Sequence, residues 1–298
     1  MLVTGQSVGK VYPKLLQLLM NGQETAPRGQ KTREVLGVQV RVEDLLQNVL
    51  VHPVRDLNYR FLVAEWLWIM AGRDDVETLA KYNGEMRKFS DNGRYLAGAY
   101  GPRLRSAFVL KPDGTTWAKC EDQLTWCVQK LREDPDSRQA VATIWTPCPG
   151  QSKDVPCTVS VQFLLRQETP FYESGRLHAI WTMRSSDAWL GFPYDFFTFS
   201  MITNCVAGEL GAKPGSLIMN LGSSHLYEEH WAKATELIAR WQEAETVLSP
   251  QLPGLPTTEA FNTMLDPGFA RPPWNMYSKA LQVKYKISAL EVLKNATS

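Results

Sequence analysis

Cys157 has the setting of a reactive thiol. It follows Pro156 directly and opens a run rich in β-branched residues, so its side chain is expected at the start of a strand. The chain has five cysteines, an odd number without a CxxC pair, which argues against both a disulfide framework and a zinc site. The two remaining uses of Cys157 are a nucleophile and a small buried apolar side chain. The other cysteines are Cys120, Cys127, Cys148 and Cys205.

Polar side chains able to hold an anion follow a second predicted strand. Arg184, Ser185, Ser186 and Asp187 come directly after it, and a guanidinium, hydroxyls and neighbouring backbone amides can form a phosphate cradle. The alternative is an ordinary solvated junction between a strand and a loop. Further along, Asp195 stands at the start of an apolar helix, where a carboxylate either serves a ligand or caps the helix.

A carboxylate inside an apolar helix is another candidate. Residues 58–71 have the composition of a buried helix that ends at Gly72. Glu65 lies in this segment among leucine and tryptophan side chains. An ionised carboxylate is costly there unless it serves chemistry or is well hydrogen-bonded, so Glu65 joins the candidate residues.

The elements that must position these residues are both strands and helices. Helices are expected at residues 196–210 and 227–248, residues 12–21 have helical apolar spacing, and residues 167–174 are expected to form a surface hairpin loop. This pattern predicts an α+β fold with a mixed sheet covered by helices, and a single domain over residues 1–298, because no repeat or linker interrupts it. Strands are expected at residues 35–42, 139–145, 158–166, 176–183, 216–221 and 281–287.

Composition narrows the possible partners. Thirty-two basic and thirty-one acidic residues give a net charge of +1, so nothing attracts the whole chain to nucleic acid or to an anionic membrane. No apolar run approaches the roughly 20 residues that span a bilayer, and the first residues lack the pattern of a signal peptide. We therefore expect a cytoplasmic protein. His225 and His230 do not have the spacing of a zinc-binding HExxH helix, so no metal site is expected.

Several motifs resemble the thymidylate synthase family, whose pattern is PCH, then RS-x-D, LG-x-PFN and LGDAHIY. The corresponding runs are PC at 156–157, RSSD at 184–187, LGFPYD at 190–195 and LGSSHLY at 221–227, with the family's spacing from RSSD onward. Upstream, AEWLWIMAG at 64–72 resembles the helix that carries the family's catalytic Glu, AGAYG at 97–101 resembles GPVYG, and DPDSR at 134–138 resembles the phosphate-arginine segment. The resemblance covers residues 58–240 in order.

The resemblance implies a nucleoside monophosphate and 5,10-methylenetetrahydrofolate as substrates. Cys157 would attack C6 of the pyrimidine, which makes C5 nucleophilic enough to accept a carbon. It also implies a homodimer in which Arg138 of one subunit reaches the phosphate held by the other. The other implied roles are nucleotide binding by Arg28, Arg184, Ser185 and Ser186, sugar binding by His225 and Tyr227, folate contact by Asp187 and Gly191, and proton transfer near the base by Glu65 with Tyr100.

Asp195 is the informative departure, because thymidylate synthases carry Asn at this position. An Asn amide matches O4 and N3–H of uracil, whereas cytosine presents a donor at N4 and an acceptor at N3. A neutral Asp can accept from N4–H and donate to N3, and an ionised Asp can pair with N3-protonated cytosine. Cytidylate hydroxymethylases, the cytosine-handling branch of the family, carry Asp here. The resemblance thus implies a deoxycytidylate 5-hydroxymethyltransferase.

Other departures leave the product and the sugar open. Thr158, Gln139, Ser223 and Ser224 replace family residues, and the last residues do not resemble the terminus that closes over folate. Addition of water at the final step gives a hydroxymethyl product, and hydride gives a methyl product, so a deoxycytidylate 5-methyltransferase stays an alternative. A cytidylate hydroxymethylase and a non-catalytic nucleotide-binding relative are further alternatives.

Overall fold

The computed structural model describes residues 1–106, 108–110, 117–119, 122–146, 150–167 and 175–265. The chain divides into two compact units, each built from separate stretches of sequence. Unit 1 contains Met1–Leu57, Cys127–Ala142 and Cys157–Gly254, and unit 2 contains Asn58–Trp126, Thr143–Pro156 and the residues from Leu255 onward. The expectation of one domain over residues 1–298 stays a prediction.

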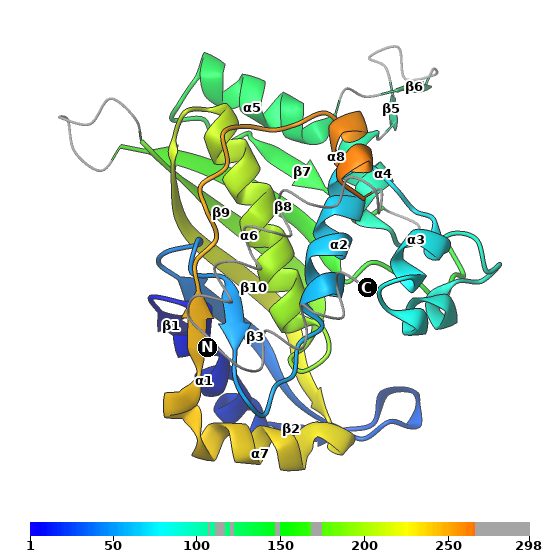
Figure 1. The fold of residues 1–298 in the computed structure, drawn as a ribbon, viewed down its shortest axis with the longest axis vertical. Helices are drawn as coiled ribbons and strands as arrows, with labels where there is room; N and C mark the ends of the chain where they lie inside the picture. Colours follow the sequence, from blue (N-terminus) through cyan, green and yellow to red (C-terminus); the bar gives the residue numbers. More distant parts are fainter. Residues whose placement is uncertain (107, 111–116, 120–121, 147–149, 168–174, 266–298) are drawn as a thin grey trace. The chain divides into compact units, whose positions relative to one another are not determined.

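A mixed seven-stranded sheet forms the core of unit 1 (Figure 1). Its order is β1-β3-β10-β9-β8-β7, with β2 paired to the edge of β3. β10 is parallel to β9 and antiparallel to β3, while β8 is antiparallel to β9. This sheet and its helices confirm the predicted α+β class. The strands are β1 (Leu2–Gly5), β2 (Gln23–Thr25), β3 (Thr32–Val42), β7 (Val141–Thr143), β8 (Thr158–Arg166), β9 (Arg176–Asp187) and β10 (Lys213–Tyr227).

Helices α1 (Val8–Met20) and α6 (Phe192–Glu209) pack on this sheet (Figure 1). Trp181 of β9 stacks on Phe199 of α6 with ring centroids 4.0 Å apart, and Tyr12 of α1 stacks on Phe192 at 6.0 Å. After its first turn α6 is buried on nearly every side, which explains why its sequence is apolar without a polar face.

In three neighbouring strands, the alternation of buried and exposed side chains is interrupted at positions that lie side by side in the sheet. The pairings on either side place Gly222 of β10 across from Gly37 of β3 and from Arg184 of β9. Gly37 has a φ of 65°, a left-handed conformation that favours glycine. A methyl group on Gly222 would lie 2.8 Å from the carbonyl oxygen of Arg184, so the strands approach closely here. In β10 the buried side chains switch from odd to even positions at this break: Leu217, Met219 and Leu221 precede it, and Ser224 and Leu226 follow it.

The segment after β10 differs from the helix expected at residues 227–248. Tyr227 still belongs to β10, because its backbone pairs with Thr32 of β3. The chain then forms η3 (Glu228–His230), α7 (Trp231–Ala239), η4 (Trp241–Glu243) and β11 (Glu245–Val247). The prediction of one continuous helix was wrong at both ends, because pairing with β3 and with β4 (Val49–Val51) takes the flanking residues into strands.

Most of the other predicted elements are present. The expected strand at 158–166 coincides with β8, and those at 35–42, 176–183 and 216–221 fall inside longer strands, whereas only Val141–Thr143 of 139–145 is a strand. The segment 12–21 lies mostly in α1, and 196–210 mostly in α6. The predicted strand at 281–287 and residues 168–174 of the predicted loop lie outside the described residues.

Unit 2 is mainly helical. α2 (Tyr59–Met70) confirms the helix predicted at 58–71: the Asn58 side chain accepts a hydrogen bond from the Phe61 amide at 2.9 Å, and Gly72 follows with a φ of 71°. The other elements are α3 (Val76–Ala80), η2 (Gly84–Phe89), α4 (Tyr100–Arg105), β5 (Phe108–Leu110), β6 (Trp117–Lys119) and α8 (Thr258–Leu265), while α5 (Gln123–Glu133) begins in unit 2 and ends in unit 1.

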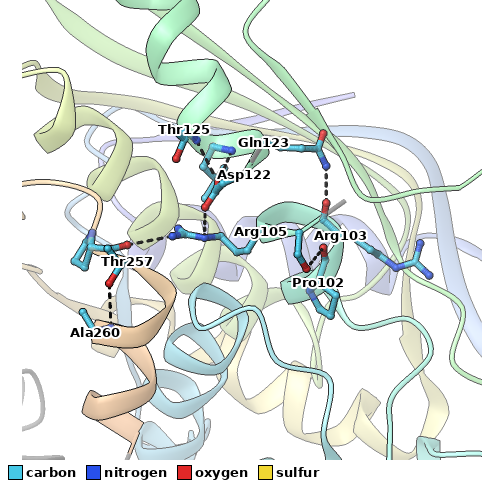
Figure 2. Close-up of polar contacts among 11 residues, drawn as sticks. Pro102, Arg103, Arg105, Asp122, Gln123, Thr125, Thr257 and Ala260 are labelled. Atoms are coloured by element: carbon cyan, nitrogen blue, oxygen red, sulfur yellow. Dashed lines mark hydrogen bonds and ion pairs between the residues drawn. The ribbon is translucent and has the colours of Figure 1, made fainter. Parts of the chain in front are cut away.

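A buried ion pair ties the parts of unit 2 together. Figure 2 shows Arg105, at the end of α4, between Asp122 and the segment that leads into α8. Nε of Arg105 lies 2.5 Å from a carboxylate oxygen of Asp122, and Nη2 donates to the carbonyl oxygen of Pro256 at 3.1 Å. The Asp122 carboxylate also accepts from the amides of Leu124 and Thr125, so this pair fixes the start of α5. Burial raises the pKa of Asp122 even though Arg105 acts in the opposite direction.

Candidate active site

Cys157 and Arg184 meet at the break in the sheet. The backbone amide of Arg184 donates to the carbonyl oxygen of Cys157 at 2.8 Å, and Nη2 of Arg184 lies 3.9 Å from Sγ of Cys157. Cys157 is half-buried, whereas Cys127 and Cys205 are fully buried, so Cys157 is the accessible thiol among the cysteines that the structure describes. A cation beside an accessible sulfur favours the thiolate, which is the nucleophilic form.

The predicted phosphate ligands differ in exposure. Arg184 is exposed and Ser185 is half-buried, so both can reach a ligand, while Ser186 is 2% exposed and its hydroxyl has no hydrogen-bond partner among the described residues. Arg138 is exposed, and its carbonyl oxygen accepts from Gln162 at 2.8 Å. Arg28 is also exposed and has a φ of 54°, a rare conformation for a non-glycine residue that indicates a constrained turn.

The loop between β9 and α6 is fixed by its own carboxylate. One oxygen of Asp187 accepts from the amide of Trp189 at 2.8 Å and from the amide of Leu190 at 3.0 Å. Gly191 is the N-cap residue of α6, and a methyl group there would lie 3.2 Å from Oδ2 of Asp195 and 3.2 Å from the Asp187 carbonyl oxygen. The missing side chain at Gly191 therefore leaves room for the Asp195 carboxyl.

Asp195 lies in the first turn of α6, and Gly191, not Asp195, is the cap residue. Its carboxyl has no hydrogen-bond partner among the described residues. Burial, and next the negative charge of Asp187, raise the pKa of Asp195 to about 7. Near neutral pH this half-buried carboxyl exists in both its neutral and its ionised form, so it is available to pair with a ligand.

His225 and Tyr227 occupy the end of β10 beyond the break. Their rings are edge to face with centroids 5.3 Å apart. In the sheet His225 stands across from Asp187 on β9 and from Glu34 on β3. The hydroxyl of Ser223 donates a short hydrogen bond to Oε1 of Glu34, so a carboxylate from β3 lies beside residue 223 of β10. No local pattern in the sequence points to Glu34, because only the strand register brings it beside residue 223.

Arg55 is a second residue that sequence analysis missed. It is buried, and Nη2 donates to the carbonyl oxygen of Trp189 at 2.7 Å. Trp189 in turn lies against His230, with ring centroids 5.6 Å apart, and burial lowers the pKa of His230. No spacing in the sequence predicts this contact, since 134 positions separate its two residues.

Glu65 and Tyr100 belong to unit 2. Glu65 is half-buried on α2, where its neighbours Ala64 and Trp66 are buried, and Tyr100 begins α4 and is also half-buried. Gly101 lies close to the backbone of Arg73, since a methyl group on Gly101 would come within 2.6 Å of the Arg73 carbonyl oxygen. The start of α4 is therefore held against the turn that follows α2.

Two features of the described residues concern metal ions and membranes. No group of three or more His, Cys, Asp or Glu side chains is arranged to hold a metal ion. None of the described helices is long and apolar enough to span a bilayer.

Comparisons with known proteins identify the family of the chain. The family model described as thymidylate synthase matches residues 10–263. A protein of Bacillus phage SP01 described as deoxyuridylate hydroxymethyltransferase is 33% identical over 272 residues, which cover 89% of this chain and 68% of the phage protein. The match spans both units, and the resemblance to the family that the motifs indicated is confirmed.

Proposed function

Since this chain belongs to the thymidylate synthase family, we propose that it is a deoxycytidylate 5-hydroxymethyltransferase. The coarser activity, transfer of a one-carbon unit to a pyrimidine nucleotide, follows from the family and from the phage relative. The base, the sugar and the product are the proposed part. The observation that carries the choice of base is the carboxyl of Asp195, whose pKa of about 7 lets both its neutral and its ionised form occur near neutral pH.

Cys157 supplies the nucleophile in this proposal. C5 of a pyrimidine is a weak carbon nucleophile, and addition of the thiolate to C6 gives C5 enamine character, which splits one difficult step into two easier ones. The 3.9 Å separation between Nη2 of Arg184 and Sγ of Cys157 supports this role, because the guanidinium stabilises the thiolate. Arg184 and Ser185 are then placed to bind the phosphate of the same nucleotide, with Arg28 as a further phosphate ligand.

Asp195 reads the base. In its neutral form the carboxyl donates to N3 of cytosine and accepts from N4–H, which satisfies both polar groups of the base edge. The missing side chain at Gly191 allows the carboxyl to lie beside the loop rather than in solvent.

Deoxyuridylate is the second candidate substrate, and the name of the phage relative favours it. A neutral carboxyl also complements uracil, since it can donate to O4 and accept from N3–H. An ionised carboxylate is an acceptor only and repels O4, but it attracts N3-protonated cytosine. The fraction of Asp195 that is ionised at the working pH therefore favours cytosine over uracil.

Water is the proposed final reactant. The phage relative is described as a hydroxymethyltransferase, which supports addition of water to the exocyclic carbon at C5 instead of hydride transfer. Glu65 and Tyr100 are the proposed groups for proton transfer near the base.

The residues of the β9–α6 loop fit a folate. One oxygen of Asp187 is used by the loop amides, and the other is left to accept from a pterin N–H. Leu190 is 54% exposed beside it and offers an apolar surface to a flat ring. 5,10-Methylenetetrahydrofolate supplies the one-carbon unit when bound. Asp187 and Leu190 would hold and orient it, with Gly191 allowing close approach.

A homodimer with a shared site is part of the proposal. Arg138 is exposed next to β7, where it is free to reach the phosphate bound by a second subunit. His225 and Tyr227 would hold the 3′-hydroxyl of the sugar. A catalytically active monomer would contradict the role of Arg138.

The test is mass spectrometry of the product after incubation with 5,10-methylenetetrahydrofolate and, separately, deoxycytidylate, cytidylate and deoxyuridylate. We expect deoxycytidylate to gain the mass of one CH2O unit. A gain of one CH2 unit would instead identify a methyltransferase, turnover of deoxyuridylate alone would establish the second candidate, and nucleotide binding without turnover would identify a non-catalytic relative. The Asp195→Asn variant should turn preference toward deoxyuridylate.

A further inference from the structure

Arg55 carries a buried cation that no carboxylate in the described part of the chain neutralises. The residue is 7% exposed, and among the described residues no Asp or Glu lies within ion-pair distance of its guanidinium. Its bonds go to backbone carbonyl oxygens: Nη1 donates to Asp56 at 2.9 Å, and Nη2 donates to Trp189 at 2.7 Å. A buried charge without an ionic partner is unfavourable for stability, and an apolar side chain of similar length would fold more easily there. The presence of an arginine at position 55 therefore indicates a role other than stabilising the fold.

The guanidinium of Arg55 contacts residues before and after Gly191 in the segment that leads to Asp195. Besides the bond to the Trp189 carbonyl oxygen, it lies over the Trp189 ring at 5.2 Å and over the Tyr194 ring at 5.8 Å. Trp189 precedes Gly191 and Tyr194 follows it, so one side chain spans the turn into α6. Asp195 is the next residue after Tyr194, and its carboxyl lies beside Gly191. These contacts require a planar group with several N–H donors. The ammonium of a lysine cannot reproduce them.

Arg55 is itself held firmly. It ends a tight turn in which its amide donates to the carbonyl oxygen of His52 at 3.0 Å. The buried His52 ring accepts from the Val54 amide at 3.1 Å, and its other nitrogen lies 3.1 Å from the carbonyl oxygen of Arg240. The turn that carries Arg55 is thereby anchored to the end of α7.

We propose that Arg55 is a positioning residue for base selection: by holding the Trp189 carbonyl and the Tyr194 ring it fixes the carboxyl of Asp195 where the base edge is read. This inference rests on the proposed function of Asp195. It does not require contact between Arg55 and substrate, because Arg55 acts through the loop. The ionisable groups around the guanidinium are Tyr12, Asp187, Tyr194 and His230, and the Tyr12 hydroxyl is fully buried beside it.

The experiment compares two substitutions at Arg55 with one at another buried arginine. Arg55→Met removes the hydrogen bond to Trp189 and the charge over both rings, while Arg55→Lys keeps the charge but not the planar fork. Arg105 is the matched control, because it is also 7% exposed but is paired with Asp122. For each folded variant, kcat/KM is measured with deoxycytidylate and with deoxyuridylate, and thermal unfolding is recorded separately.

The ratio compared is kcat/KM for deoxycytidylate divided by kcat/KM for deoxyuridylate. We expect Arg55→Met to reduce this ratio about tenfold or more, and Arg55→Lys to reduce it by a smaller factor. Arg105→Met should lower the unfolding temperature and leave the ratio unchanged. An unchanged ratio in Arg55→Met would overturn the proposal, as would an equal loss of ratio in Arg105→Met, which would indicate general damage to the fold.

Asp195→Asn distinguishes this inference from the proposed function. If Asp195→Asn leaves the ratio unchanged, the base is read elsewhere, and both the assignment of Asp195 and the inference about Arg55 fail. If Asp195→Asn alters the ratio and Arg55→Met does not, the assignment of Asp195 stands and only the role of Arg55 is refuted. Should Arg55→Met fail to fold, the ratio in Arg55→Lys decides: an unchanged ratio there refutes the inference.

Discussion

Sγ of Cys157 lies 3.9 Å from Nη2 of Arg184, and the same two residues share a backbone hydrogen bond of 2.8 Å. The backbone bond aligns the start of β8 with the break in β9, so the side-chain contact follows from the sheet. A residue expected to bind phosphate thereby also brings a cation next to the candidate nucleophile. In the proposed function, one guanidinium would therefore serve both phosphate binding and thiol activation.

Arg184→Met should slow alkylation of Cys157 by iodoacetamide at neutral pH. A unit charge at about 4 Å in a water-exposed setting contributes roughly 1 kcal/mol, which corresponds to about a fivefold lower rate. The rate is measured by mass spectrometry of the peptide that contains Cys157. Arg132→Met, which removes an exposed arginine that pairs with Glu209 and has no role in the proposed site, is the control and should leave the rate unchanged. Equal rates in the wild type and Arg184→Met would show that the guanidinium does not act on the sulfur.

Two glycines of the sheet break should respond differently to alanine. In Gly222→Ala the new methyl group would press on the Arg184 carbonyl oxygen, which lies 2.8 Å from its position, so Arg184 must move. We expect kcat/KM to fall about tenfold or more, since small displacements of positioning groups are costly. In Gly37→Ala nothing lies within 4 Å of the methyl group, and only the φ of 65° is unfavourable.

Gly37→Ala is therefore the matched variant, with a stability loss of about 1 kcal/mol and a smaller loss of activity. Urea unfolding and steady-state kinetics of both variants check the pair. If both variants lost activity equally, displacement of Arg184 would not be the cause.

The buried pair in unit 2 should contribute strongly to stability. The side chains of Arg105 and Asp122 are 3% and 17% exposed, so Arg105→Met leaves a buried carboxylate without its cation. We expect a loss of about 3–5 kcal/mol in the free energy of unfolding, measured with urea. Lys88→Met is the control, because its pair with Glu85 is 72% and 66% exposed and should contribute under about 1 kcal/mol. A loss below that of the control would contradict the structural role of Arg105.

Local signals in the sequence were sufficient for several elements. The apolar run that ends at Gly72 predicts α2, and the β-branched and aromatic residues at 158–166 predict β8. Cys157, Arg184 and Asp195 were found because motifs with fixed spacing mark them. The same local signals failed at residues 227–248, where pairing with β3 and β4 overrides helical spacing.

Contacts between distant segments could not be predicted from one sequence. Arg55 lies in a short turn with no motif, and its role depends on a loop 134 positions away. Glu34 lies beside Ser223 only because β3 and β10 pair in a particular register. The pKa of Asp195 likewise depends on its depth in unit 1 and on Asp187, and both of these are properties of the folded chain.

Asp195→Asn should stabilise the protein in a pH-dependent way. Burial and the charge of Asp187 raise the pKa of Asp195 from 3.8 to about 7, so the folded state binds a proton that the unfolded state releases. The stability that comes from the neutral carboxyl is fully present below the unfolded pKa and is lost as the pH rises toward the folded pKa. At roughly 1.4 kcal/mol per pKa unit, the upper bound on the loss is about 4 kcal/mol.

Asn cannot ionise, so the gain in unfolding free energy of Asp195→Asn should grow from pH 5 to pH 7 and level off above pH 7. Urea unfolding of both proteins across this range measures the gain. Asp187→Asn keeps an oxygen for the loop amides but removes the charge, so in that background the Asp195→Asn gain should be smaller and should level off at a lower pH. A gain that is the same at every pH would mean that Asp195 does not change its ionisation in this range, and the proton proposed to be shared with the base would not be available.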